Sequence, residues 1–150
     1  MKTQLTSLVL AGCVLAAALV FAFNLRANEP AVARVAEHAN GLLIERGRYL
    51  VDHVGLCADC HTPRGEKGEL LSALWLQGAP IGFAPKFPMP WAEAAPPIAG
   101  LPSMNDEQAL VFLTTGVRPD GSNPRPPMPP YRFSESDARA VIAYLRTLDR

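Results

Sequence analysis

The sequence predicts an all-α domain of three to four helices joined by long proline-rich loops, preceded by an N-terminal hydrophobic helix. Apolar residues recur at helical spacing in two separate stretches, and helix-start signals occur at two points. Of the 15 prolines, 13 lie between residues 80 and 130, so long regular elements are not expected there. We find no alternation typical of paired strands and no internal repeat.

Composition fits a small carrier protein rather than a nucleic-acid-binding protein. At 150 residues, the chain is expected to contain one domain plus appendages. Its 14 basic and 14 acidic residues balance, and the basic ones are scattered, so no nucleic-acid partner is expected. We expect an N-terminal membrane anchor or export signal at residues 1–25, a polar tether at 26–40 and the folded domain at 41–150.

The N-terminal segment predicts export. Residues 3–25 contain no charged side chain and lie between Lys2 and Arg26, and the apolar stretch is long enough to cross a bilayer as a helix. Three fates are open: an uncleaved anchor, a cleaved signal with Ala-Val-Ala at 31–33 as the best site, or lipidation at the lipobox-like Leu-Ala-Gly-Cys of 10–13. All three place the domain on the periplasmic side of a bacterial inner membrane, anchored or as a free periplasmic protein.

The first helix of the domain is expected to begin near Gly41 and to end at Gly55. Gly47 in its middle costs about 1 kcal/mol relative to alanine, which suggests a close helix crossing. The residues at helical spacing are Leu42, Leu43, Arg46, Tyr49, Leu50, Val51 and Val54, with Glu45, Arg48 and Asp52 on the outer side.

The most informative motif is Cys-Ala-Asp-Cys-His at residues 57–61. Two thiols three positions apart can add to the two vinyl groups of a haem, and the adjacent histidine is then held where its imidazole can bind iron. Two other interpretations are a redox dithiol and half of a zinc site. A dithiol would require a βαβ context, which is not found. A zinc site needs two more ligands, and only Cys13, His38 and His53 remain.

The following segment, residues 69–102, is rich in Pro, Ala and Trp. Its aromatic residues are expected to pack in the core, to wall a haem or to form a docking surface. They are Trp75, Phe83, Phe87 and Trp91.

Two further helices carry start signals. Asn105 with Gln108 predicts a capped helix that ends at Gly116, and Ser134 with Asp137 predicts the C-terminal helix. The last helix has one apolar stripe, formed by Ala138, Val141, Ile142, Leu145 and Leu148, while Arg139 and Arg146 are expected to face water.

A haem iron at this motif needs a sixth ligand or an open position. Met128 lies between two Pro-Pro pairs, and Met89 has similar proline neighbours, which restrict the backbone of both. Met104 has no such neighbours. His38 and His53 are possible nitrogen ligands, but His53 is too near the attachment motif to reach around the ring. From the residues alone, Met128 and Met89 both stay open.

From about Gly41 to Leu148 the chain resembles a class I cytochrome c domain, most closely the monohaem domains of cytochrome subunits of bacterial membrane dehydrogenases. The resemblance implies Cys57, Cys60 and His61 as haem-binding residues and Met128, before the last helix, as the distal iron ligand. It also implies that Gly47 crosses the last helix near Tyr144 and Leu145. The segments that carry this resemblance are residues 47–51, 57–64, 113–121, 127–129 and 137–148. The segment 69–102 departs from the family pattern and is longer than a minimal cytochrome loop.

The resemblance implies electron transfer by one covalent haem c with His/Met ligation. The chain is expected to act as a membrane-tethered or periplasmic carrier, not as an enzyme by itself, with redox proteins as partners and with the membrane as a partner if the N-terminal helix is uncleaved. Two alternatives are an electron-accepting subunit of a membrane dehydrogenase or oxidase complex, and a haem sensor or peroxidase-like protein with an open sixth position. Arg64, Arg118 and Arg125 are candidates to pair with haem propionates.

Overall fold

The computed structural model describes residues 31–148. The chain divides into two compact units, Met1–Asn40 and Gly41–Arg150. In the first unit, residues 31–40 are helical and exposed. The predicted anchor or signal at residues 1–25 lies outside the described residues, and the predicted tether is described only from residue 31. Within residues 31–148, no helix has both the length and the apolar content needed to cross a bilayer.

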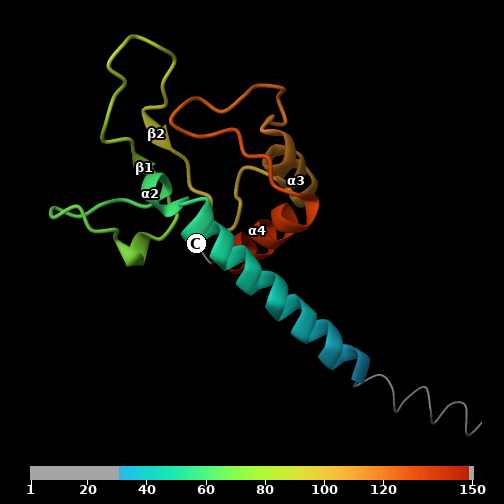
Figure 1. Ribbon diagram of the computed structural model, residues 1–150. Coiled ribbons are helices and arrows are strands. Elements are labelled where there is room, and N and C mark those ends of the chain that lie inside the picture. The colour runs from blue at the N-terminus through green and yellow to red at the C-terminus, as the bar shows by residue number, and fades with distance from the viewer. Residues whose placement is uncertain (1–30, 149–150) are drawn as a thin grey trace, which may run out of the picture. The chain divides into compact units, whose positions relative to one another are not determined.

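The second unit is mostly helical (Figure 1). Residues 41–49 are α-helical and lead into a π-helical turn. In chain order, the labelled elements are η1 (Leu50–Val54), α2 (Ala58–His61), η2 (Ser72–Leu74), β1 (Ala79–Pro80), β2 (Ala94–Ala95), α3 (Asp106–Thr115) and α4 (Glu135–Thr147). The helical class is therefore confirmed. The two strands, which were not expected, form a two-residue antiparallel pair, with Ala79 opposite Ala95.

Both helix starts predicted from capping residues are confirmed, whereas the helix start expected near Gly41 is wrong, because residues 31–40 are already helical. The Asn105 side chain accepts from Gln108 N at 2.8 Å, and the Gln108 side chain accepts from Asn105 N at 3.1 Å, which completes a capping box. Gly116 ends α3 with φ of 76°, a left-handed conformation that favours glycine. Ser134 caps α4 by accepting from Asp137 N at 3.2 Å.

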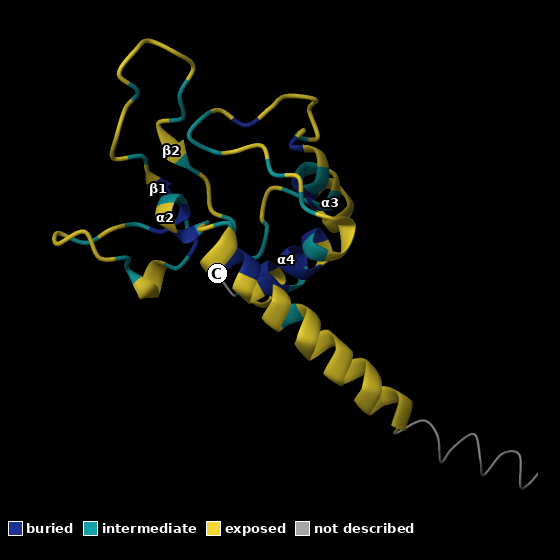
Figure 2. Ribbon diagram, in the orientation of Figure 1, coloured by how far each residue is buried: buried dark blue, intermediate teal, exposed yellow. Residues whose placement is uncertain are grey.

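The core is built around α4, whose inward face is buried along its length (Figure 2). This helix packs against α3 and against η1. Residues 41–49 cross it at Gly47, where a Cβ would lie 2.6 Å from the carbonyl carbon of Ala140 and 2.8 Å from Tyr144 Cβ. Only glycine permits this approach, so the predicted close crossing is confirmed.

The burial of the first helix is narrower than its apolar pattern suggests. Leu50 and Val51 are buried, but Leu42, Tyr49 and Val54 are at least half exposed. The buried residues lie in the turn that follows the crossing at Gly47, where the chain meets α4. Apolar spacing therefore predicted the helix but not the extent of its buried face.

Arg146 was expected only to face water, but its side chain also binds the segment before α3. Its guanidinium donates to the carbonyl oxygens of Gly100 at 2.6 Å and Met104 at 2.9 Å, and to Asp106 Oδ1 at 2.9 Å. This single side chain thereby fixes the segment that leads into α3 against the end of α4.

Candidate haem site

One cavity with a mainly apolar lining lies within the second unit. Its lining comes from η1, α2, the segment 92–98, α3, α4 and the loop before α4. The residues that carry candidate chemistry in this lining are Cys57, Cys60, His61, Met104, Arg118, Arg125, Met128 and Tyr131. An apolar cavity of this kind suits a large, flat, mostly apolar cofactor.

The attachment segment is a single helical turn. Cys57 is the N-cap of α2, and its carbonyl oxygen accepts from His61 N at 2.9 Å. Cys60 lies within the same turn, and both cysteines are half-buried free thiols that line the cavity. A turn of this kind brings two thiols three positions apart to one side of the chain.

Burial shapes the chemistry of Cys57. Loss of water around its sulfur raises the pKa of the Cys57 thiol to about 11, so the thiol is neutral at physiological pH. A high thiol pKa is opposite to what a reactive dithiol requires. Cys57 is therefore not suited to be the attacking thiolate of a redox dithiol.

The orientation of His61 is fixed by one hydrogen bond. The His61 ring is buried, and its Nδ1 lies 2.7 Å from the carbonyl oxygen of Pro96. A carbonyl only accepts, so Nδ1 carries the proton and Nε2 keeps a lone pair. Burial also lowers the pKa of the His61 imidazole, which favours the neutral ring. A neutral imidazole with Nδ1–H bonded to a backbone carbonyl is the state that binds a metal through Nε2.

Backbone N–H groups of Leu76 and Gly78 also hold His61 and its neighbour Thr62 in place. Gly78 N donates to His61 O at 2.7 Å, and Leu76 N donates to the hydroxyl of the buried Thr62 at 2.9 Å. Leu76 O in turn accepts from Ile98 N at 2.9 Å. The irregular segment 76–98 is thus the support that positions the imidazole.

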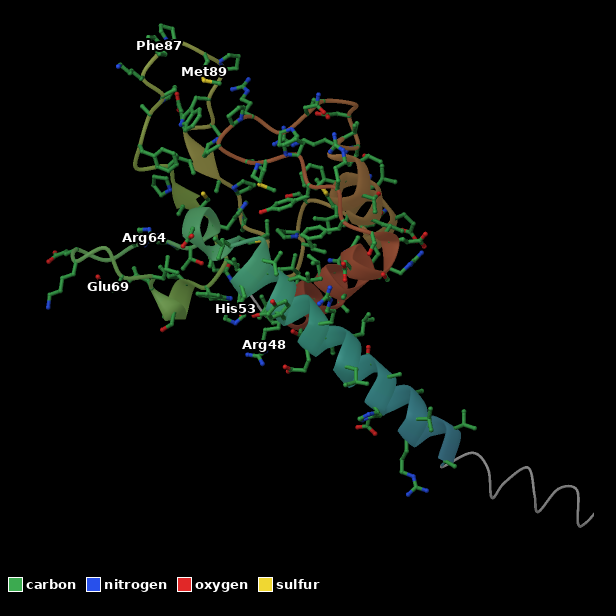
Figure 3. All side chains as sticks on the ribbon, viewed as in Figure 1. Arg48, His53, Arg64, Glu69, Phe87 and Met89 are labelled. Atoms are coloured by element: carbon green, nitrogen blue, oxygen red, sulfur yellow. The ribbon has the colours of Figure 1, made fainter. Side chains whose placement is uncertain are left out.

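Two of the described methionines line the cavity. Met128 is half-buried and lies in a loop that is tied at Pro126 O to Ala92 N, at 2.8 Å. Met104, just before α3, also lines the cavity, although its sequence neighbours gave no signal for it. Met89 is 49% exposed and lies with Phe87 at the far end of the loop between β1 and β2 (Figure 3).

The candidate arginines and histidines also divide into those that line the cavity and those that do not. Arg118 and Arg125 line the cavity, whereas Arg64 binds Asp59 Oδ1 at 3.2 Å and Gly68 O at 2.8 Å. His53 is exposed and its ring lies 5.7 Å from that of Tyr49. His38 is exposed in the first unit.

The aromatic residues of segment 69–102 do not wall the cavity. Phe83 and Phe87 are 57% and 71% exposed, while Trp75 packs against the core. Aliphatic residues and prolines of the same segment form the lining instead: Ile81, Ala92, Ala94, Ala95, Pro96, Pro97, Ile98, Leu101 and Pro102. Core packing therefore holds for Trp75 but fails for Phe83 and Phe87.

Sequence reasoning missed the Pro96 carbonyl and Tyr131, and it gave Met104 no support. A backbone acceptor has no residue-type signal. Tyr131 follows the Met-Pro-Pro stretch directly, and this position was its only hint.

The residues present fit a c-type haem better than a bare metal ion. Two thiols, a neutral imidazole with a free Nε2 and thioether sulfurs meet at one mainly apolar cavity. In the described part of the chain, no group of three or more His, Cys, Asp or Glu side chains could hold a metal ion. The zinc interpretation therefore finds no ligand set there.

Sequence comparisons relate the chain to known haem proteins. The sequence model of the cytochrome c family matches residues 44–149. The chain is 30% identical over 121 residues to the fructose dehydrogenase cytochrome subunit of Gluconobacter japonicus, a match that covers 76% of this chain and 24% of that protein. It is 32% identical over 111 residues to a diheme cytochrome c-type protein of Cereibacter sphaeroides, covering 68% and 34% respectively. The chain thus spans about a quarter to a third of these relatives.

Proposed function

The chain belongs to the class I cytochrome c family, and from this we propose that it transfers electrons through one c-type haem, which Cys57 and Cys60 would hold covalently and to whose iron His61 and Met128 would bind. The observation that carries the proposal is the Nδ1 contact of His61 with Pro96 O, which leaves Nε2 available in a mainly apolar cavity. When bound, the haem supplies one-electron exchange between ferrous and ferric iron.

The side chains have separate tasks. Cys57 and Cys60 would hold the group by thioether bonds, and one Cys-x-x-Cys-His motif in a chain with 3 cysteines supports one attachment site. Pro96 keeps the His61 imidazole in one tautomer and one orientation. The thioether of Met128 would favour ferrous iron, and the apolar lining would disfavour the extra charge of ferric iron. Both effects raise the reduction potential.

Met128 is favoured over the other methionines. Met89 is half exposed and lies away from the cavity lining, whereas Met104 lines the cavity without neighbouring prolines. Met128 lines it from a loop whose proline neighbours restrict the backbone on both sides. A ligand held this way loses little entropy when it binds.

We also propose that the chain works as the electron-accepting subunit of a dehydrogenase complex, and not as an enzyme by itself. The support is its likeness to the cytochrome subunit of a fructose dehydrogenase. Its place would be the periplasmic side of the inner membrane, tethered or free, because residues 3–25 carry no charge. Co-purification with a large catalytic subunit in stoichiometric amount tests this, and isolation of the chain without such a subunit under mild conditions contradicts it.

The ligand proposal is tested by expressing the chain with a c-type cytochrome maturation system and replacing each methionine. The oxidised wild-type protein should show the weak far-red absorption band of Met–Fe ligation. Met128→Ala should abolish the band, while Met89→Ala and Met104→Ala should keep it. Loss of the band in Met104→Ala alone would move the ligand to that residue. A high-spin wild-type spectrum with rapid carbon monoxide binding would favour the sensor or peroxidase-like alternative.

A further inference from the structure

Tyr131 joins two parts of the cavity wall that are far apart in the sequence. It lies three residues after Met128, in the loop before α4, and its hydroxyl donates to the carbonyl oxygen of Gly55, 76 residues away. Gly55 ends η1 and stands two residues before Cys57. The hydrogen bond therefore connects the loop that carries Met128 to the segment that carries the two cysteines.

The surroundings of this hydrogen bond are close-packed. A Cβ on Gly55 would lie 3.2 Å from Cys57 Sγ and 3.4 Å from the Tyr131 hydroxyl, so the sulfur and the phenol oxygen flank the same point. The Tyr131 ring stacks on Phe133, with 5.0 Å between centroids and 12° between planes. The hydroxyl can thus be removed while the ring keeps its packing.

The backbone between Tyr131 and Met128 is stiff, so a restraint on Tyr131 also restrains Met128. Only Pro129 and Pro130 separate the two residues, and proline rings fix the backbone φ angle. The same loop is tied at Pro126 O to Ala92 N and at Phe133 N to Leu113 O, which are contacts with other elements. Tyr131 supplies the tie to the attachment segment itself.

We propose that Tyr131 is a positioning residue for Met128: its hydroxyl, anchored on Gly55 O, holds the methionine loop against the attachment segment and so keeps the sixth iron position closed. This inference rests on the proposed His/Met ligation. Without this hydrogen bond Met128 is still present, but it should leave the iron more often, because one hydrogen bond no longer opposes movement of its loop.

The test is the rate of carbon monoxide binding to the reduced holoprotein, which requires the methionine to leave. Tyr131→Phe should bind carbon monoxide about fivefold faster than the wild type, the effect of losing one hydrogen bond. Tyr49→Phe, which removes a hydroxyl from a half-exposed tyrosine outside the cavity lining, should bind at the wild-type rate. In a Met128→Ala background, Tyr131→Phe should have no further effect.

The outcomes separate the inference from the ligand proposal. A lower thermal midpoint for Tyr131→Phe with an unchanged carbon monoxide rate means a structural role only, and overturns the inference. An equal effect of Tyr131→Phe with and without Met128 also overturns it. If Met128→Ala itself leaves the rate unchanged, the ligand proposal fails first. Should Tyr131→Phe give too little holoprotein, Pro129→Ala loosens the same connection and should raise the rate in the same direction.

Discussion

Replacing Gly47 by alanine tests the helix crossing that closes the fold. The new Cβ would meet the backbone of Ala140 and lie 2.8 Å from Tyr144 Cβ, and a backbone carbonyl cannot rotate away. Overpacking of this kind costs about 3 kcal/mol at the upper end of its usual range. Alanine regains about 1 kcal/mol of helix propensity over glycine. The free energy of unfolding should therefore fall by about 2 kcal/mol.

Gly41 offers a matched control in the same helical stretch. A Cβ there has no atom within 4 Å, so Gly41→Ala should only gain helix propensity, about 1 kcal/mol. Thermal unfolding of the holoproteins, followed by circular dichroism, should give a midpoint about 10 °C lower for Gly47→Ala and about 5 °C higher for Gly41→Ala. If both substitutions raise the midpoint equally, the close crossing at Gly47 does not exist.

Three further predictions concern stability and are checked by urea unfolding. Arg146→Ala should lower the free energy of unfolding by about 2 kcal/mol, because loss of the guanidinium leaves backbone carbonyls and a carboxylate unpaired. Arg139→Ala breaks only an exposed i,i+4 pair and should lower it by about 0.4 kcal/mol. Equal losses in the two variants would contradict the role of Arg146 in fixing the segment before α3. Asn105→Ala removes the acceptor of the α3 capping box and should cost about 1 kcal/mol, and no change would mean that the cap is unimportant. Arg46→Ala should lower the stability slightly near neutral pH, because Arg46 pairs with Asp137 at 3.0 Å and lowers the pKa of that carboxyl. A lowered folded-state pKa means that this stabilisation is present above the ordinary value of 3.8 and is lost as the pH falls through the folded-state pKa, so the two proteins should converge in strong acid.

Local signals predicted the helices well because their causes are local. The caps at Asn105 and Ser134 depend on side chains within three residues of the helix start, and both are found. Gly116 ends α3 for an equally local reason, its left-handed backbone. The same reasoning predicted a tight crossing at Gly47 but needed the family resemblance to name its partner helix.

Other features depend on contacts that spacing does not encode. The guanidinium contacts of Arg146 are tertiary contacts made from α4, and no sequence signal marked the π-helical turn of η1. Segment 69–102 contributes mainly backbone groups, aliphatic residues and prolines, so its aromatic residues misled the search for a cavity wall. Of the candidate site residues, Cys57, Cys60 and His61 were predicted from a motif, whereas the choice among methionines depended on resemblance; all of them stay predictions.

The most direct test of the central claim is mass spectrometry of the proteolytic peptide that contains residues 57–61, from protein produced with a c-type cytochrome maturation system. We expect this peptide to carry the mass of one haem, joined through both sulfurs and stable to acid-acetone extraction. Recovery of the unmodified peptide with two alkylatable thiols from such material would contradict the assignment.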